Sequence, residues 1–182
     1  MRAARFAAAR PPHSGRRSVL ALGVLKMTVI HLETLIEAPI DRVFDLSRSI
    51  DAHQDTAEHT RERAIAGVTS GLLGLNEEVT WEASHFGIKQ RLRVKMSKFD
   101  RPNYFQDVML EGAFRSMKHD HSFKEVSGGT LMTDRFEFSS PCGFIGRLVD
   151  VLILERYMRE FILNRNAILK RTAESEDWRR YL

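Results

Sequence analysis

The apolar positions of this chain change their spacing twice, and each change marks a new type of secondary structure. Residues 28 to 37 read TVIHLETLIE, which is rich in β-branched and apolar residues, and Pro39 closes this segment. A proline fits the first helical position, where its missing N–H costs nothing, and apolar residues at i, i+3 and i+4 follow from Ile40. We therefore expect a strand, a helix beginning at Pro39, and a second short helix over about 50–57.

Between residues 61 and 139 the apolar period is two, and turns that contain glycine or proline interrupt it repeatedly. Alternating segments separated by such turns are typical of antiparallel strands joined in sequence order. The pattern predicts a six-stranded meander. Together with the first strand, this gives a sheet of about seven strands.

The alternation is clearest in two neighbouring segments, residues 78–85 and 88–96. Their apolar face holds Val79, Trp81, Ala83, His85, Ile88, Gln90, Leu92, Val94 and Met96. On the other face, acidic side chains of the first segment lie beside basic side chains of the second, and such charges pair across a solvated surface. We interpret the basic side chains of residues 88–96 as part of an ion-paired outer face, and we expect no nucleic-acid partner.

After Ser140 and Pro141 the spacing becomes helical and stays so for about 30 residues. The apolar stripe of this segment holds Leu148, Val151, Leu152, Leu154, Met158, Phe161, Ile162, Ile168 and Leu169. A long helix that follows a sheet with one apolar face buries its stripe by lying across that face. We predict an α+β domain over residues 27–173, followed by a polar tail, 174–182, that frays.

Strand parity places ionisable groups on the buried face of the sheet. Side chains alternate between the faces of a strand, so His119 and His121 lie on the same side as Phe123. By the same rule Asp134 and Asp107 point inward among apolar neighbours. Buried polar groups need hydrogen-bond partners or a wet cavity, so we expect these four side chains to meet in the interior.

Three chemistries fit this cluster. His119 and His121 with Asp134 or Asp107 resemble two-histidine, one-carboxylate metal ligation. A histidine oriented by an aspartate can also act as a general base. The interpretation we favour is structural and ligand-orienting: the histidine–aspartate pairs satisfy one another and offer a polar anchor inside an apolar cavity.

Composition and charge narrow the choice of function. The sequence has 28 basic and 24 acidic side chains and a net charge of +4. Residues 1–26 carry six of the basic and none of the acidic groups, so the remainder has a net charge of −2. We expect the leader to be disordered, as a targeting segment or a start called too early. The body has no uninterrupted apolar run long enough for a spanning helix, so we expect no stable membrane insertion.

The single cysteine and the absence of several catalytic motifs exclude some classes of protein. Cys142 is the only cysteine, which excludes a disulfide framework and fits a reducing compartment. We interpret it as a small apolar residue rather than a nucleophile. The sequence has no P-loop, dinucleotide fingerprint or nucleophile elbow.

The order of elements resembles the START-like, or SRPBCC, superfamily, whose fold is the helix-grip. The resemblance covers about residues 28 to 173. It is specific for the cyclase/dehydrase-like, polyketide cyclase-related branch, although its motifs are structural. The segments that carry it are EAPIDRVFDL, VTWEASHFGIKQRLRVKMSKFDRP, EGAFRSMKHDHSFKEVSGGTLMTDRFEF and SPCGFIGRLVD.

This resemblance implies a curved antiparallel sheet wrapped on the long C-terminal helix, with a hydrophobic cavity between them that binds lipids, polyketides or isoprenoids. Such folds host binders and enzymes alike. Carried onto this sequence, the resemblance makes the cavity lining Trp81, His85, Leu92, Phe105, Asp107, Met109, His119, His121, Asp134, Phe136 and Met158.

We therefore predict a cytoplasmic carrier or sensor of a hydrophobic small molecule, which needs no cofactor and no catalysis. His119, His121 and Asp134 would orient the polar end of that molecule. One alternative is a polyketide-type cyclase or dehydratase in which the same groups move protons. A second alternative is a protein-interaction module. The pattern does not specify an oligomeric state.

Overall fold

A computed structural model describes residues 27–56 and 61–182 of the chain. The leader expected over residues 1–26 lies outside the described residues, as does Ala57, the last residue expected for the second helix.

Seven antiparallel strands form one sheet in the order β1-β7-β6-β5-β4-β3-β2, as the alternating pattern predicts. The strands from β2 to β7 follow one another as a meander. β1 is the edge strand beside β7 and pairs with it along its whole length. The strand bounds are β1 (Thr28–Ile36), β2 (Arg63–Gly67), β3 (Glu78–His85), β4 (Ile88–Asp100), β5 (Tyr104–Glu111), β6 (Ser116–Val126) and β7 (Gly129–Ser139).

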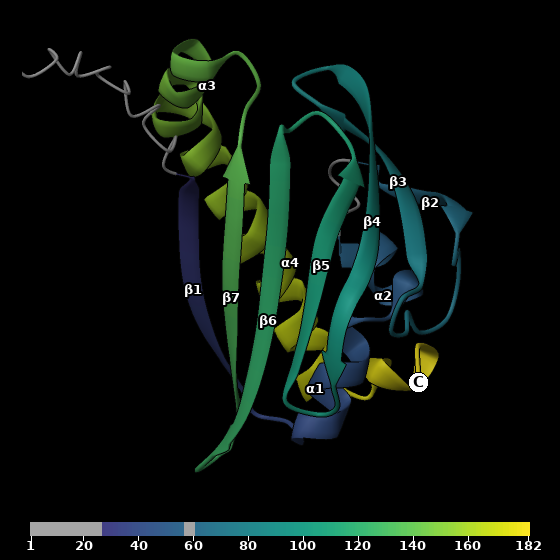
Figure 1. The fold of residues 1–182 in the computed structure, drawn as a ribbon. Helices are drawn as coiled ribbons and strands as arrows, with labels where there is room; N and C mark the ends of the chain where they lie inside the picture. The colour runs from purple at the N-terminus through teal and green to yellow at the C-terminus, as the bar shows by residue number, and fades with distance from the viewer. Residues whose placement is uncertain (1–26, 57–60) are drawn as a thin grey trace, which may run out of the picture.

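Two short helices connect β1 to β2, and a long helical segment follows β7 (Figure 1). The first helix begins at Ile40, one residue later than predicted, because Pro39 is its N-cap rather than its first helical residue. The long segment runs diagonally across one face of the curved sheet, which is the helix-grip arrangement (Figure 1). The helical bounds are α1 (Ile40–Ser47), α2 (Ile50–Thr56), α3 (Gly143–Val149), the π-helical turn η2 (Asp150–Leu154), α4 (Glu155–Glu174) and the 3-10 turn η3 (Asp177–Arg180).

Aromatic packing joins α1 to the sheet. Phe44 on α1 is completely buried, and its ring makes edge-to-face contacts with Phe99, Phe105 and Phe123. The centroids lie 5.3 to 5.5 Å apart, which is the favoured geometry for aromatic pairs. The sheet and α1 therefore share one core at this end of the molecule.

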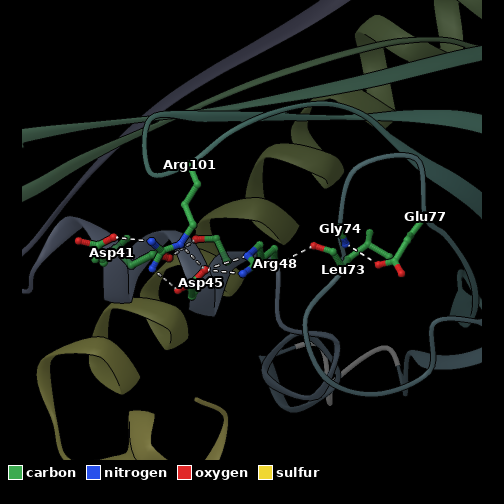
Figure 2. Close-up of polar contacts among 9 residues, drawn as sticks. Asp41, Asp45, Arg48, Leu73, Gly74, Glu77 and Arg101 are labelled. Carbon is green, nitrogen blue, oxygen red and sulfur yellow. Dashed lines mark hydrogen bonds and ion pairs between the residues drawn. The ribbon is translucent and has the colours of Figure 1, made fainter.

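Ion pairs fix the same end of the fold from outside (Figure 2). Arg101, in the turn after β4, contacts both oxygens of Asp45 at 3.2 and 2.7 Å and also pairs with Asp41. Arg48 contacts Asp45 at 2.7 Å and donates to the carbonyl of Leu73 at 3.0 Å. Burial alone would raise the pKa of Asp45, but the two guanidinium groups hold it below its usual value. The turn after β4 and the loop before β3 are thus both tied to α1.

The N-terminal part of the predicted helical stripe does not lie on the sheet, so that part of the prediction is wrong. Leu148, Val151 and Leu152 are 51%, 54% and 68% exposed, whereas Ile162 and Leu169 are buried. The helix extends beyond the ends of β1 and β7 at α3, so no sheet lies beneath it there (Figure 1). Leu148 lies in α3, and Val151 and Leu152 lie in the π-helical turn η2, whereas α4 contacts β1 of the sheet.

The tail expected to fray instead packs against the helices. In η3 and after it, Trp178 and Tyr181 pack against the core, and Tyr181 donates to Asp55 at 2.6 Å. The guanidinium of Arg42 lies 4.5 Å from the Trp178 ring. Two aromatic residues in a polar tail are enough to anchor it.

Phe44→Ala should lower the free energy of unfolding by about 3–5 kcal/mol, because it empties a site enclosed by three other rings. Phe144→Ala removes the same ring from α3, where Phe144 is 78% exposed, and should change stability by less than about 0.5 kcal/mol. Urea denaturation of both variants measures this difference. Equal losses would contradict the placement of the core.

Candidate functional site

A cavity of about 270 Å³ lies between the inner face of the sheet and α4. Its walls are mainly apolar and aromatic, which suits a ligand with a large apolar surface. The apolar side chains that line it include Trp81, Val94, Met96, Phe105, Phe114 and Phe136 from the sheet and its loops, and Leu154, Met158, Phe161 and Ile162 from the helix.

A buried carboxylate organises the polar side of the cavity. Nε2 of His119 lies 2.8 Å from Oδ1 of Asp134, and Nδ1 of His121 lies 3.0 Å from the same oxygen. Asn166, on α4, donates to the other oxygen at 2.6 Å. Asp134 is 1% exposed, so this cluster links β6, β7 and α4 out of contact with bulk water.

The environment fixes the charge states in this cluster. Burial alone would raise the pKa of Asp134, but the two histidines hold it well below its usual value. Burial lowers the pKa of His121 to about 3. At neutral pH the arrangement is therefore an ionised carboxylate beside a neutral imidazole.

Asp107 contributes a carboxyl group to the cavity wall. Its Oδ2 lies 3.7 Å from Nε2 of His121, and its buried Oδ1 has no hydrogen-bond partner among the described residues. Burial raises the pKa of Asp107 to about 6. A carboxyl group that titrates near neutral pH inside a cavity can exchange a proton with a bound molecule.

A second polar pair lies on the wall formed by α2 and the start of β2. His53 stacks on Trp81 at 4.2 Å, and its Nε2 lies 3.2 Å from Oε2 of Glu62. Burial lowers the pKa of His53, although Glu62 opposes this change. Burial alone would raise the pKa of Glu62, but His53 holds it below its usual value. Both groups line the cavity and already have a partner.

The cavity reaches the surface beside the turn between β3 and β4. Phe86 and Ala113 both line it and are both exposed. Nδ1 of His85 lies 2.7 Å from the hydroxyl of Tyr157, and the ring of Phe86 lies 4.5 Å from that of Tyr157. Phe86 has φ 52, a left-handed conformation that is uncommon for a residue other than glycine. The two-residue turn thus brings an aromatic ring against the start of α4 at this opening.

All the residues predicted to line the cavity do so except Met109 and Asp134. Asp134 lies behind the two histidines, because the neighbouring strand β6 carries them over it on the inner face. Met109 is turned toward Gly112, where an added Cβ would come 2.8 Å from its sulfur. Asp134 therefore contacts His119 and His121 rather than the cavity itself. Met109 packs next to Gly112, outside the cavity lining.

Two polar residues on α4 were missed by the sequence analysis. Arg165 and Asn166 are buried together with Ile162 and Leu169 on the face that contacts the sheet. Their spacing from Ile162 is i+3 and i+4, which is the signal that could have found them. His53 has the same signal on α2, three positions after buried Ile50, whereas Glu62 has none.

The metal alternative has three suitable donors. One ligand atom from each of His119, His121 and Asp134 lies within 4.8 Å of the others, so they could reach one ion. His119 is also within hydrogen-bonding distance of Asp134, and Asn166 donates to the other oxygen of Asp134. Both carboxylate oxygens thus have partners without an ion. This geometry does not require a metal.

Asp107→Asn should stabilise the protein at pH 8 by about 1–3 kcal/mol. Burial in the folded state raises the pKa of Asp107 to about 6. Protonation of this group therefore stabilises the folded state fully near pH 4, and this stabilisation is lost as the pH rises through 6. Asparagine imitates the protonated form and keeps that contribution. Denaturation at pH 4 and pH 8 measures the effect, with Glu111→Gln at the exposed end of the same strand as the control. An equal difference at both pH values would contradict the assignment.

No family model matches the sequence, and no curated protein is significantly similar to it. No helix among the described residues is long and apolar enough to cross a bilayer.

Solved structures do match the fold. TTHA0849 from Thermus thermophilus is 18% identical with a TM-score of 0.67, over 80% of this chain and 97% of that one. The ginseng major latex-like protein 151 from Panax ginseng is 13% identical with a TM-score of 0.61, over 81% and 97%. The di-domain ARO/CYC StfQ of the steffimycin biosynthetic pathway is 10% identical with a TM-score of 0.66, over 83% of this chain and 52% of that one. The chain therefore shares its fold with these proteins, a curved antiparallel sheet that grips a long C-terminal helix.

Proposed function

We propose that this protein binds a hydrophobic small molecule, such as a lipid, a polyketide or an isoprenoid, in the cavity between the sheet and α4. It acts as a carrier or sensor in the cytoplasm. The observation that carries this proposal is the cavity itself, which combines apolar walls with a small number of fixed polar groups. The single cysteine, Cys142, supports a reducing compartment.

The walls supply enough driving force for such binding. Removal of apolar surface from water contributes about 25 cal/mol per Å². A ligand that buries about 200 Å² of apolar surface thus gains about 5 kcal/mol before the costs of association. Polar groups such as His119 and Asp107 would then fix its orientation.

The second candidate function is that of a cyclase or dehydratase. It is favoured by Asp107, whose pKa near 6 and position beside His121 suit proton transfer to a bound ligand. The similarity in fold to a protein described as ARO/CYC is consistent with it. Neither the proposed binding nor this candidate requires a cofactor.

The carrier function predicts that the protein purified from a native cell carries an organic molecule in the cavity. Native mass spectrometry should detect an added mass that disappears on denaturation. Ala83→Phe should abolish that mass, because Ala83 lines the cavity and is 6% exposed, so a phenyl ring would occupy the ligand's space.

Ala167→Phe adds the same ring on the exposed side of α4 and should leave the added mass unchanged. If Ala83→Phe carries as much of the molecule as the wild type, the ligand binds elsewhere. A co-purifying stoichiometric protein with an empty cavity would instead favour the interaction module.

If the protein is a cyclase with Asp107 as its base, turnover of a poly-β-ketone should rise with pH through about 6, because only the ionised carboxylate accepts a proton. Asp107→Asn should abolish turnover while binding of the same compound persists. Steady-state rates between pH 5 and 8 measure both effects. A rate unaffected by this substitution would exclude Asp107 as the base.

A further inference from the structure

One charged group in the cavity forms no ion pair with any of the described residues. Arg165, on α4, is 8% exposed and lines the cavity. Its Nη2 donates to the backbone carbonyl of Ser47 at 3.1 Å, and it makes no ion pair with a carboxylate among the described residues. A buried guanidinium that contacts no carboxylate directly is costly, and it carries five N–H donors in a planar fork.

The nearby acids are already engaged or are poor partners. Glu62 pairs with His53, and Asp134 is held by His119 and Asn166. Asp107 is close enough for Arg165 to influence its ionisation, but the two side chains form no ion pair. The remaining N–H groups of Arg165 are therefore available to a molecule in the cavity.

We infer that Arg165 is the binding site for an acidic group on the ligand, so that the molecule bound is an amphipathic acid. This inference rests on the proposed binding function and names the chemical class of the ligand. A carboxylate, a sulfonate or another anion with two oxygens on one atom can accept two parallel hydrogen bonds from a guanidinium, which gives orientation as well as affinity.

The position of Arg165 along α4 defines how such a ligand lies. Tyr157, at the open end of the cavity, precedes Arg165 by eight residues, which corresponds to about 12 Å along the helix. Met158, Phe161 and Ile162 line the cavity between these positions. The acid therefore lies at the inner end, and the apolar part of the ligand extends toward the opening.

Asp107 is the group that opposes this arrangement. As an anion it would repel a bound acid, whereas in its protonated form it could donate a hydrogen bond to it. Asp107→Asn removes the repulsion and keeps a donor. The structure thus implies opposite effects of substitutions at Arg165 and Asp107 on the binding of an anion.

Two fluorescent probes with the same aromatic skeleton test the inference. 8-Anilino-1-naphthalenesulfonate carries an anionic group, and N-phenyl-1-naphthylamine lacks it. Arg165→Gln should weaken binding of the sulfonate about tenfold or more, because a charge-assisted hydrogen bond is lost, and should change binding of the neutral probe less than twofold. Asp107→Asn should strengthen binding of the sulfonate only.

Arg171→Gln removes a positive charge from the exposed side of the same helix and should leave both affinities unchanged. Equal affinities of wild type and Arg165→Gln for the sulfonate, with the neutral probe still bound, would overturn the inference. If the wild type binds neither probe, the proposed cavity function fails instead.

A measurement on the wild type alone covers the case in which Arg165→Gln does not fold. 1-Naphthylacetic acid and its amide have the same skeleton and nearly the same shape, but only the acid is charged at neutral pH, and both should displace the neutral probe. The acid should do so at a concentration about tenfold lower. An amide that competes as well as the acid would contradict an acid-binding site at Arg165.

Discussion

The buried carboxylate of Asp134 is the interaction on which the rest of the structure depends. It lies on β7, accepts a hydrogen bond from His119 on β6, lies 3.0 Å from His121, and accepts from Asn166 on α4. The sheet and the helix that it grips are thereby joined by polar contacts as well as apolar ones. Removing one member of such a cluster leaves the others buried without partners, which costs more than any single bond contributes. The cavity beside it can stay open because its polar wall is held in this way.

Strand periodicity predicted most of the inner face because parity has only two outcomes. Once Met117 and Phe123 are assigned to the core, His119 and His121 must lie beside them, and the structure places them there. The same rule turned Asp107 inward. Parity cannot show which inward side chain covers another, so Asp134 was expected to line the cavity although the histidines screen it.

Helical periodicity was less informative because an apolar stripe does not show where the sheet beneath it ends. Leu148 and Leu152 belong to the stripe but are exposed, the first in α3 and the second within the π-helical turn. Arg165 was overlooked for the opposite reason, since a charged residue at a stripe position is usually assigned to the solvent side. Its buried guanidinium donates to the carbonyl of Ser47 and lines the cavity, and neither contact can be predicted from helical periodicity alone.

The contact between Tyr157 and the β3–β4 turn lies at the open end of the cavity, where a bound molecule would enter and leave. The hydrogen bond with His85 and the ring contact with Phe86 join two elements at the open end. Separating them requires only a local opening, whose free energy is far below that of global unfolding. The residence time of a bound molecule would thus be governed by this small hinge-like motion. In the proposed function, affinity would depend on Arg165 at the inner end of the cavity, and exchange rate on the Tyr157 contacts at the open end. Each could change without the other.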